Sequence, residues 1–318
     1  MKKRVLSGLA IIAIIILMFV SRMWTPYIFD ACMGLIIVGA SFEMSKMMLR
    51  AGYYNYTILA CVFPVILYAI TMTLLLLEIN IIIVFASVLI ALVGLTLLTY
   101  VFSLIFKKWL KSDLQIRKIQ TSYSNFSFRK SIYTMSAFIY PTVFMFFLIF
   151  MNHMPDFGYV LKDVANFGSI DLGLIALVIA FLIPIISDTF AMLIGMALRG
   201  PKLSPKTSPN KTIAGFVGGT IMSTLFIVAL YFILISFNDI RLAFELSNIT
   251  LVHFAMMGLF GSIIATLGDL FESLLKRKAV VKDSGNIIPG HGGVLDRVDS
   301  HVFNAAFIFF FFFILLLW

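Results

Sequence analysis

Residues 172–198 read LGLIALVIAFLIPIISDTFAMLIGMAL, an apolar run that contains one ionisable side chain, Asp188. The run is long enough to cross a bilayer, because a transmembrane helix needs about 20 predominantly apolar residues. Similar hydrophobic segments recur along the chain, at about 5–20, 27–42, 57–77, 80–106, 132–151, 213–236, 249–267 and 301–318. The sequence therefore predicts an all-α, polytopic membrane protein of about nine transmembrane helices.

The composition supports this prediction. Apolar residues make up 61% of the 318 residues, charged residues make up 12%, and the mean hydropathy is +1.06. Soluble domains carry about 25% charged residues, so this chain has more apolar surface than one water-soluble core could bury. The basic start at residues 2–4 and the apolar run after it resemble a signal peptide, but no small-x-small cleavage site follows. We therefore expect a retained first span.

The cations of the chain indicate its orientation. When the N-terminus is placed in the cytoplasm, 21 of the 24 Lys and Arg residues fall on that side, and only Arg22, Lys162 and Arg241 lie outside. By the positive-inside rule we expect a multi-pass protein of the inner (plasma) membrane, with a cytoplasmic N-terminus and an outside C-terminus. The net charge of +9 is explained by basic loops that face anionic headgroups, so no nucleic-acid partner is expected. The longest of them, 107–131, is either a solvated loop or an interfacial segment that grips acidic lipid.

Asp188 is the first candidate for function. An ionisable group inside an apolar span is costly to bury and therefore indicates a functional site. Pro184 precedes it by one turn and is expected to break the helix and to free backbone carbonyls nearby. The alternative is a carboxylate near the cytoplasmic end of the span, paired with a lysine or arginine.

The loop 199–212, RGPKLSPKTSPNKT, is the second candidate. It holds four cations, four Ser or Thr hydroxyls and three prolines. Prolines stiffen a loop, and cations with hydroxyls before a helix N-terminus could cradle a triphosphate. A simple connection between two spans is the alternative.

The segment 268–300 is the strongest candidate, because it holds ten Asp, Glu, Lys or Arg residues. Each charge costs about 2.5–3.5 kcal/mol at the bilayer centre, so the segment must be aqueous or line a water-filled cavity. Asp269 and Glu272 share a helix face, as do Asp296 and Asp299. Carboxylates from two short helices can hold Mg²⁺, and the glycine-rich turn 289–293 can bring backbone N–H groups close to a phosphate. With three cations at 276–278 to neutralise a leaving pyrophosphate, the segment is suited to phosphoryl or nucleotidyl transfer.

Structural alternatives remain for single members of this segment. The cations at 276–278 could anchor a span at the cytoplasmic surface, and His291 could be a turn residue without a role in proton transfer. Glu272 and Asp299 could be partners in helix salt bridges.

Two sets of motifs stand out between residues 185 and 300. One consists of SLLKR at 273–277, KDSG at 282–285, PGHGG at 289–293 and DRVD at 296–299. The other runs through SDT at 187–189, Gly195, KL at 202–203, Pro205, SP at 208–209 and KT at 211–212. Over roughly residues 185–300 the chain therefore resembles the phosphatidate cytidylyltransferase family, with the first set as the signature. The sequence departs from the family at IAG, 213–215, where relatives usually have Trp-Glu-Gly, so Ala214 stands in place of a glutamate.

The resemblance implies transfer of the cytidylyl group of CTP to phosphatidic acid, which gives CDP-diacylglycerol and pyrophosphate. It implies a dimer with a polar cavity open to the cytoplasm and the bilayer, and a Mg²⁺ site built around Asp269 and Asp296 with a K⁺ ion beside it. The expected catalytic residues are Asp188, Asp269, Lys276, Arg277 and Asp296. The expected substrate-binding residues are Lys202, Lys206, Ser208, Lys211, Thr212, Lys282, Asp283, Gly290, His291, Gly292, Gly293, Arg297 and Asp299.

Two regions follow from this distribution, an N-terminal transmembrane region at 1–170 and a catalytic transmembrane region at 171–318. Two alternatives to the cytidylyltransferase activity stay open. One is another lipid-directed nucleotidyl- or phosphotransferase, and the other is a transporter with an intramembrane ion site at Asp188. The chemistry of the segment 268–300 argues against the transporter, as does the lack of an internal repeat.

Overall fold

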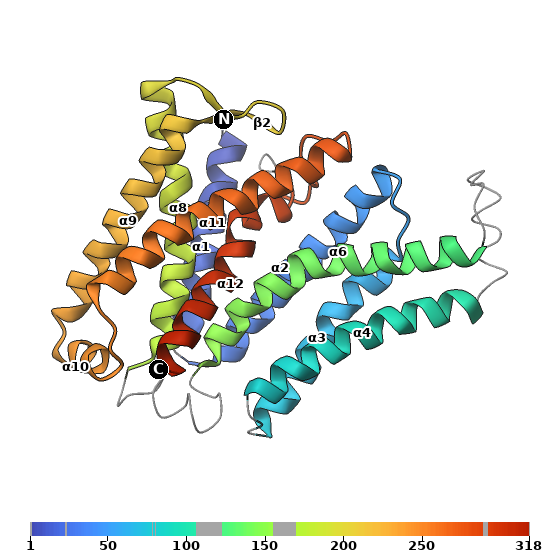
Figure 1. The fold of residues 1–318 in the computed structure, drawn as a ribbon, viewed down its shortest axis with the longest axis horizontal. Helices are drawn as coiled ribbons and strands as arrows, with labels where there is room; N and C mark the ends of the chain where they lie inside the picture. The colour runs from blue at the N-terminus through green and yellow to red at the C-terminus, as the bar shows by residue number, and fades with distance from the viewer. Residues whose placement is uncertain are drawn as a thin grey trace.

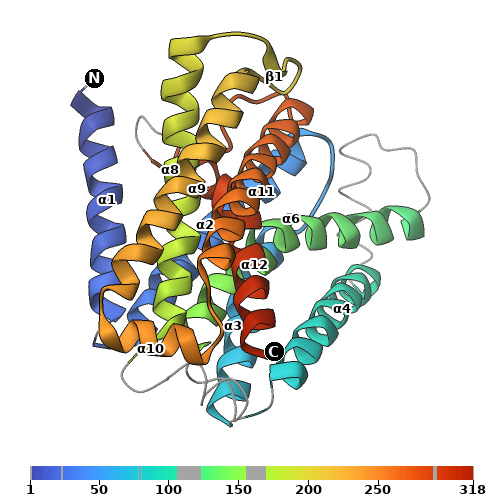
Figure 2. The same ribbon diagram turned by 60° about the vertical axis from the view of Figure 1, so that its left-hand side comes forward.

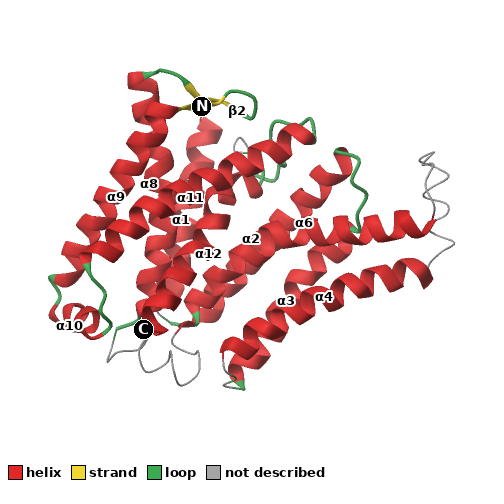
Figure 3. Cartoon of the chain, in the orientation of Figure 1, coloured by secondary structure: helices red, strands yellow, loops and turns green. Residues whose placement is uncertain are grey.

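The computed structural model describes residues 2–22, 24–77, 79, 81–105, 123–154, 170–288 and 292–317. These residues are almost entirely helical, and the two short strands pair in one antiparallel hairpin (Figures 1 and 3). The elements are α1 (Lys2–Arg22), α2 (Pro26–Arg50), α3 (Thr57–Leu76), α4 (Ile81–Ile105), α6 (Tyr123–Asn152), α8 (Leu172–Leu198), β1 (Lys202–Ser204), β2 (Ser208–Thr212), α9 (Ile213–Ile235), α10 (Asn238–Leu246), α11 (Leu251–Lys278) and α12 (Leu295–Leu317). The prediction of an all-α fold is confirmed.

Each of the nine predicted hydrophobic segments coincides with one long helix. Among the described residues, eight helices are long and apolar enough to cross a membrane, and a shorter apolar helix, Ile12–Arg22, lies within α1. The start of α1 and the end of α12 lie at opposite ends of the bundle in both views (Figures 1 and 2). The eight candidate spans agree with a multi-pass membrane protein.

The helices near the C-terminus form the part of the bundle that carries the candidate site. Helix α9 packs against α8 and α11, and α12 packs against α11, α8 and α6. Small residues allow the close approach of α8 and α9, since a Cβ on Gly219 would lie 2.5 Å from the Ser187 carbonyl oxygen. Helices α3 and α4 lie on the far side of α6 from this group (Figure 1).

The expectation that Pro184 breaks its helix is wrong. Helix α8 continues from Leu172 to Leu198 with Pro184 inside it. Proline has no N–H, so the carbonyl of Ala180, one turn earlier, loses its helical donor. Asn304 of α12 supplies a replacement, since its Nδ2 donates to the Ala180 oxygen at 2.8 Å. The freed carbonyl was therefore correctly predicted, and a neighbouring helix satisfies it without a break.

The charged segment 268–300 is more helical than the two short helices expected from its sequence. Helix α11 extends to Lys278 and α12 begins at Leu295, so both long helices carry the charges at their ends. Each helix is apolar in its membrane-length part and polar where it reaches the cavity described below.

Candidate active site

A cavity of about 1030 Å³ opens between the ends of α8, α11 and α12, the hairpin and the start of α9. Its polar lining residues are Asp188, Arg199, Lys202, Asn210, Lys211, Thr212, Thr266, Asp269, Lys276, Asp283, Asp296, Arg297 and Asp299. Apolar side chains, among them Met192, Met196 and Phe216, line it as well. The cavity is therefore amphipathic, with cations and carboxylates beside an apolar wall.

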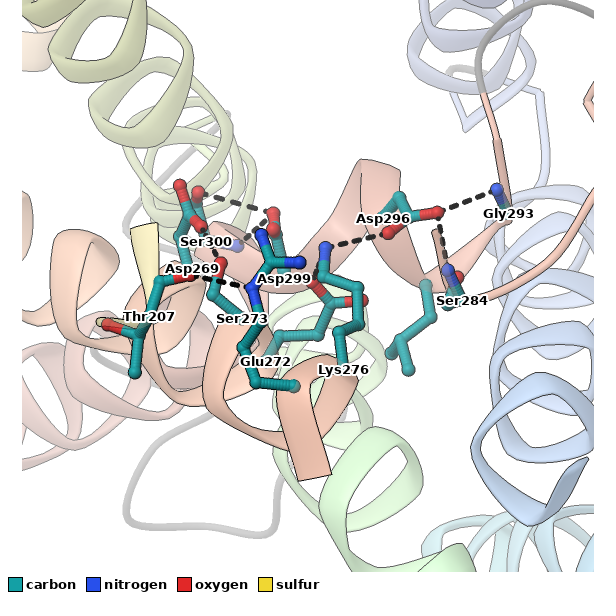
Figure 4. A network of polar contacts seen from close by, with 12 residues as sticks. Thr207, Asp269, Glu272, Ser273, Lys276, Ser284, Gly293, Asp296, Asp299 and Ser300 are labelled. Atoms are coloured by element: carbon teal, nitrogen blue, oxygen red, sulfur yellow. Dashed lines mark hydrogen bonds and ion pairs between the residues drawn. The ribbon is translucent and has the colours of Figure 1, made fainter. Parts of the chain in front are cut away.

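Lys276 links the two helices that carry the signature. Its ammonium group pairs with Glu272 one turn earlier on α11 and with Asp296 of α12, whose Oδ1 accepts at 2.8 Å (Figure 4). The Lys276 side chain is only 13% exposed, and the Glu272 side chain is fully buried. The alternative of a helix salt bridge is therefore confirmed for Glu272, and Lys276 points inward, unlike a lysine that anchors a span at the membrane surface.

Asp296 binds both described parts of the loop between α11 and α12, residues 281–288 and 292–294, which is called the signature loop below. Its Oδ2 accepts hydrogen bonds from the backbone N–H of Ser284 at 2.9 Å and of Gly293 at 2.8 Å. Gly292 has a φ of +87°, and a Cβ there would lie 2.8 Å from the same oxygen. Glycine is needed at this position for both reasons. The N–H of Gly293 thus faces a protein carboxylate in this structure, whereas the sequence suggested that it would face a phosphate.

Three further carboxylates line the cavity, from three different helices. Ser300 donates through Oγ to Asp188 Oδ2 at 2.8 Å and lies 3.4 Å from Asp299 Oδ1 (Figure 4). Asp269 of α11 accepts from Ser273 at 3.3 Å and pairs with the ammonium group of Lys211. Carboxylates gathered in one place favour the binding of a cation between them.

The hairpin brings its own cations to the cavity. Lys211 reaches Asp269 from β2, and Thr212 caps α9 by accepting from the Gly215 N–H at 3.1 Å. Arg277 of α11 donates through Nε to the Thr207 carbonyl at 3.1 Å, and this hydrogen bond connects the hairpin to α11. The loop predicted at 199–212 is therefore an ordered hairpin rather than a simple connection.

The structure brings together most, though not all, of the residues expected from the sequence. Ten of them line the cavity: Asp188, Lys202, Lys211, Thr212, Asp269, Lys276, Asp283, Asp296, Arg297 and Asp299. Six others are described but do not line it: Lys206, Ser208, Arg277, Lys282, Gly292 and Gly293. Gly290 and His291 lie outside the described residues, as does most of the basic loop 107–131. The roles proposed for these residues stay predictions.

Sequence reasoning missed Glu43 of α2. This carboxylate is 2% exposed and accepts hydrogen bonds from Ser284 Oγ and from the Leu295 N–H, both at 2.9 Å. It therefore contacts the signature loop from the N-terminal part of the chain. The argument applied to Asp188, an ionisable group inside an apolar run, would have found Asp30 of the same helix but not Glu43, which follows the predicted run 27–42.

The arrangement suits the chemistry of phosphate groups. The lysine and arginine side chains of the cavity can bind and neutralise phosphates, and its carboxylates can hold a divalent ion. The apolar side chains beside them can accommodate the acyl part of a lipid. These elements would allow a nucleotide and a phospholipid to meet in one cavity.

Comparison with known proteins agrees with this chemistry. The model of the Cytidylyltransferase family matches residues 2–315. A phosphatidate cytidylyltransferase of Bacillus subtilis (strain 168) is 42% identical over 123 residues, which are 39% of this chain and 42% of that protein. One of Staphylococcus aureus (strain COL) is 46% identical over 132 residues, 41% of this chain and 46% of that protein. The aligned regions thus span less than half the length of these relatives.

Proposed function

The chain belongs to the cytidylyltransferase family, and on this premise we propose that it transfers the cytidylyl group of CTP to phosphatidic acid. The products are CDP-diacylglycerol, for phospholipid synthesis, and pyrophosphate. The single observation that carries the proposal is the amphipathic cavity, which joins cations and carboxylates to an apolar wall. A phosphorylated lipid and a nucleoside triphosphate need both kinds of surface.

The apolar wall supports entry of the lipid from the bilayer. Met192 and Met196 lie one turn apart on α8, line the cavity, and have 57% and 60% of their surface exposed. Side chains exposed on an apolar helix of a membrane protein face lipid. We infer that the acyl chains of phosphatidic acid remain in the bilayer beside these residues while its phosphate enters the cavity.

The chemical step needs positioning rather than a strong base. An oxygen of the phosphatidic acid phosphate attacks the α-phosphorus of CTP, and the bond from that phosphorus to the β-phosphate oxygen breaks. The nucleophile is already ionised at neutral pH, so no proton has to be removed. We propose that Lys202 and Lys211 bind the triphosphate from the hairpin, and that Lys276 and Arg297 neutralise charge near the α-phosphate and the leaving pyrophosphate.

The residues fit Mg²⁺, the ion expected for this chemistry. Mg²⁺ prefers one or two carboxylates together with waters and substrate phosphates. Asp269 and Asp296 line one cavity and would be the protein ligands, although Asp296 Oδ1 is paired with Lys276 in this structure. When bound, Mg²⁺ supplies charge neutralisation between the two reacting phosphates. In this structure the ammonium group of Lys211 is paired with Asp269. We expect Lys211 to leave Asp269 and to bind the triphosphate when CTP binds. A K⁺ ion beside this site is part of the same proposal.

Radiolabelled CTP tests the activity. Purified protein supplied with [α-³²P]CTP, phosphatidic acid and Mg²⁺ should produce chloroform-soluble label, and diacylglycerol in place of phosphatidic acid should not. Label in the lipid phase only with another acceptor would indicate a different lipid-directed transferase. No lipid label with any acceptor would contradict the proposal and favour the transporter.

We also propose that the cavity faces the cytoplasm of a cell whose inner (plasma) membrane holds the protein, as the positive-inside rule predicts. A reporter active only outside the cytoplasm, fused after Trp318, should give signal. The same reporter fused after Lys206, in the exposed turn of the hairpin, should not. The reverse pattern would overturn the orientation.

A homodimer is the expected assembly. The mass of the purified protein in a detergent of known micelle mass, measured by light scattering, should correspond to two chains of 35.7 kDa. A mass of one chain under conditions that preserve activity would contradict the dimer.

A further inference from the structure

We propose that Glu43 is a positioning residue that holds the described parts of the signature loop, 281–288 and 292–294, and the start of α12 in the geometry needed for nucleotidyl transfer. The inference rests on the proposed function for its catalytic part, whereas its structural part stands on the contacts of the loop alone. Glu43 lies on α2, more than two hundred residues before the loop that it contacts.

The first argument is the pattern of hydrogen bonds. Ser284 gives its hydroxyl to Glu43 Oε2 and its backbone N–H to Asp296 Oδ2, each at 2.9 Å. Leu295, the first residue of α12, gives its N–H to the same oxygen of Glu43 at 2.9 Å. One carboxylate from α2 and one from α12 therefore hold the loop from its two sides.

The second argument is steric. A Cβ added to Gly285 would collide with the Glu43 carboxylate, and one added to Gly293 would collide with it and with the Ser284 hydroxyl. Neither glycine has a positive φ, so backbone conformation does not require them. They leave room for the carboxylate, and a Cβ added to Gly39, one turn earlier on α2, would lie 3.5 Å from Val294 Cγ2 of the loop.

The third argument is electrostatic. A carboxylate at the N-terminus of a helix interacts favourably with the helix dipole, and Glu43 stands at the first N–H of α12. Its Oε1 is buried without a hydrogen-bond partner among the described residues. Burying a charged group with an unpaired oxygen costs free energy of folding, so stability alone does not explain a glutamate at this position.

The consequence for the site passes through Asp296. Ser284, whose hydroxyl donates to Glu43, also donates its backbone N–H to Asp296 Oδ2, as does Gly293. This orientation of the Asp296 carboxylate presents Oδ1 to Lys276 at 2.8 Å. Glu43 does not line the cavity and is therefore not a catalytic residue. It acts on the reaction only through the position of Asp296 and Lys276.

The test compares Glu43→Met, which removes the acceptor and fills the space, with a matched control on the same helix. Asp30 is equally buried, at 1% exposure, but its partners Tyr68, Asn152 and His153 belong to the other end of the bundle. Amide hydrogen exchange without substrates is measured first. In Glu43→Met, exchange of the segment 281–295 should rise roughly tenfold or more, with little change in α8 or α9, and Asp30→Leu should leave this segment as in the wild type.

Turnover of the folded fraction is measured second. Glu43→Met should lower kcat roughly tenfold or more, and Glu43→Gln, which keeps an acceptor oxygen, should recover part of the loss. Ser284→Ala, which removes one donor, should move exchange and kcat in the same direction and decides the matter if Glu43→Met does not fold. Wild-type exchange in the segment, or equal kcat in the Glu43 and Asp30 variants, would overturn the proposal. A wild-type protein without transferase activity would refute the proposed function, and the exchange data would still decide whether Glu43 holds the loop.

Discussion

The bundle has a buried polar group at each end, and the two groups differ in how completely they are paired. At the end away from the cavity, Arg22 pairs with Asp171 at 2.5 Å and donates to Asn152 Oδ1 at 2.6 Å. Asn152 and His153 in turn reach Asp30, at 2.8 and 2.6 Å. None of these five residues has a buried side-chain atom without a partner among the described residues, and none lines the cavity.

The group at the cavity is incompletely paired. Glu272 Oε1 and Glu43 Oε1 are buried without hydrogen bonds in the described part of the chain, and Asp188, Asp269 and Asp299 face the cavity. Buried polar groups are normally satisfied, and exceptions often mark functional sites. The comparison teaches that burial of charge alone does not indicate function in this bundle. Carboxylates from several helices that line one cavity, as Asp188, Asp269 and Asp299 do, indicate it better.

The largest effect on activity is expected when either of the two carboxylates proposed to hold the metal loses its charge. Asp269→Asn and Asp296→Asn keep the side-chain shape and remove the charge. Each should lower kcat by roughly 100-fold or more at any Mg²⁺ concentration, because charge stabilisation at the reacting phosphates is lost. Incorporation of labelled CTP into lipid measures the effect, and Asp239→Asn on the exposed face of α10 is the control. Near-normal activity in either variant would remove that residue from the site.

A smaller effect is expected for the hairpin lysine. Lys211→Ala should lower kcat/KM for CTP by roughly 10- to 150-fold, the value of one charge-assisted contact of about 1.5–3 kcal/mol. Lys211→Arg should restore only part of it, because guanidinium geometry differs from that of an ammonium group.

Lys206 is the matched control for Lys211, since it lies on the same hairpin, is exposed and does not line the cavity. Lys118 belongs to the basic loop 107–131 and lies outside the described residues, so it is not used as a control. If Lys206→Ala and Lys211→Ala gave the same kinetics, the hairpin would not bind the triphosphate, and the site would consist of the segment 268–300 alone.

The smallest effect on activity is expected at the fully paired end. Arg22→Met leaves Asp171 and Asn152 without their partner and should lower stability by about 1–3 kcal/mol. The kcat/KM of the folded protein should stay at the wild-type value. Thermal unfolding in detergent measures the first and CTP kinetics the second. Arg241→Met, at an exposed ion pair with Glu245, should change stability by less than about 1 kcal/mol. A loss of CTP affinity in Arg22→Met would show that the two ends are coupled.

The sequence predicted the fold class and most of the cavity because both leave local signals. Nine apolar runs gave nine long helices, and the charges at 268–300 could not face lipid. What could not be predicted depends on contacts between distant segments. Whether Pro184 breaks α8 is decided by Asn304, 120 residues later, and Glu272 is neutralised by a lysine that also serves another helix. Glu43 has no motif around it, so its role appears only when α2 is placed against the signature loop.

The bond between Asn304 and Ala180 also bears on how the protein is assembled. During synthesis α8 enters the membrane long before α12 is made, so its proline leaves one carbonyl exposed to hydrocarbon, where an unsatisfied backbone group costs several kcal/mol. Ser300, one turn before Asn304, also reaches Asp188 of α8, and the two bonds together fix both the rotation and the depth of α12. A nascent chain that stops before α12 would retain the defect in α8 and lack Asp296, Arg297 and Asp299, which complete the cavity. The proline thus makes the last helix a requirement for a stable α8, and incomplete chains become recognisable to membrane quality control by the same defect that deprives them of a site.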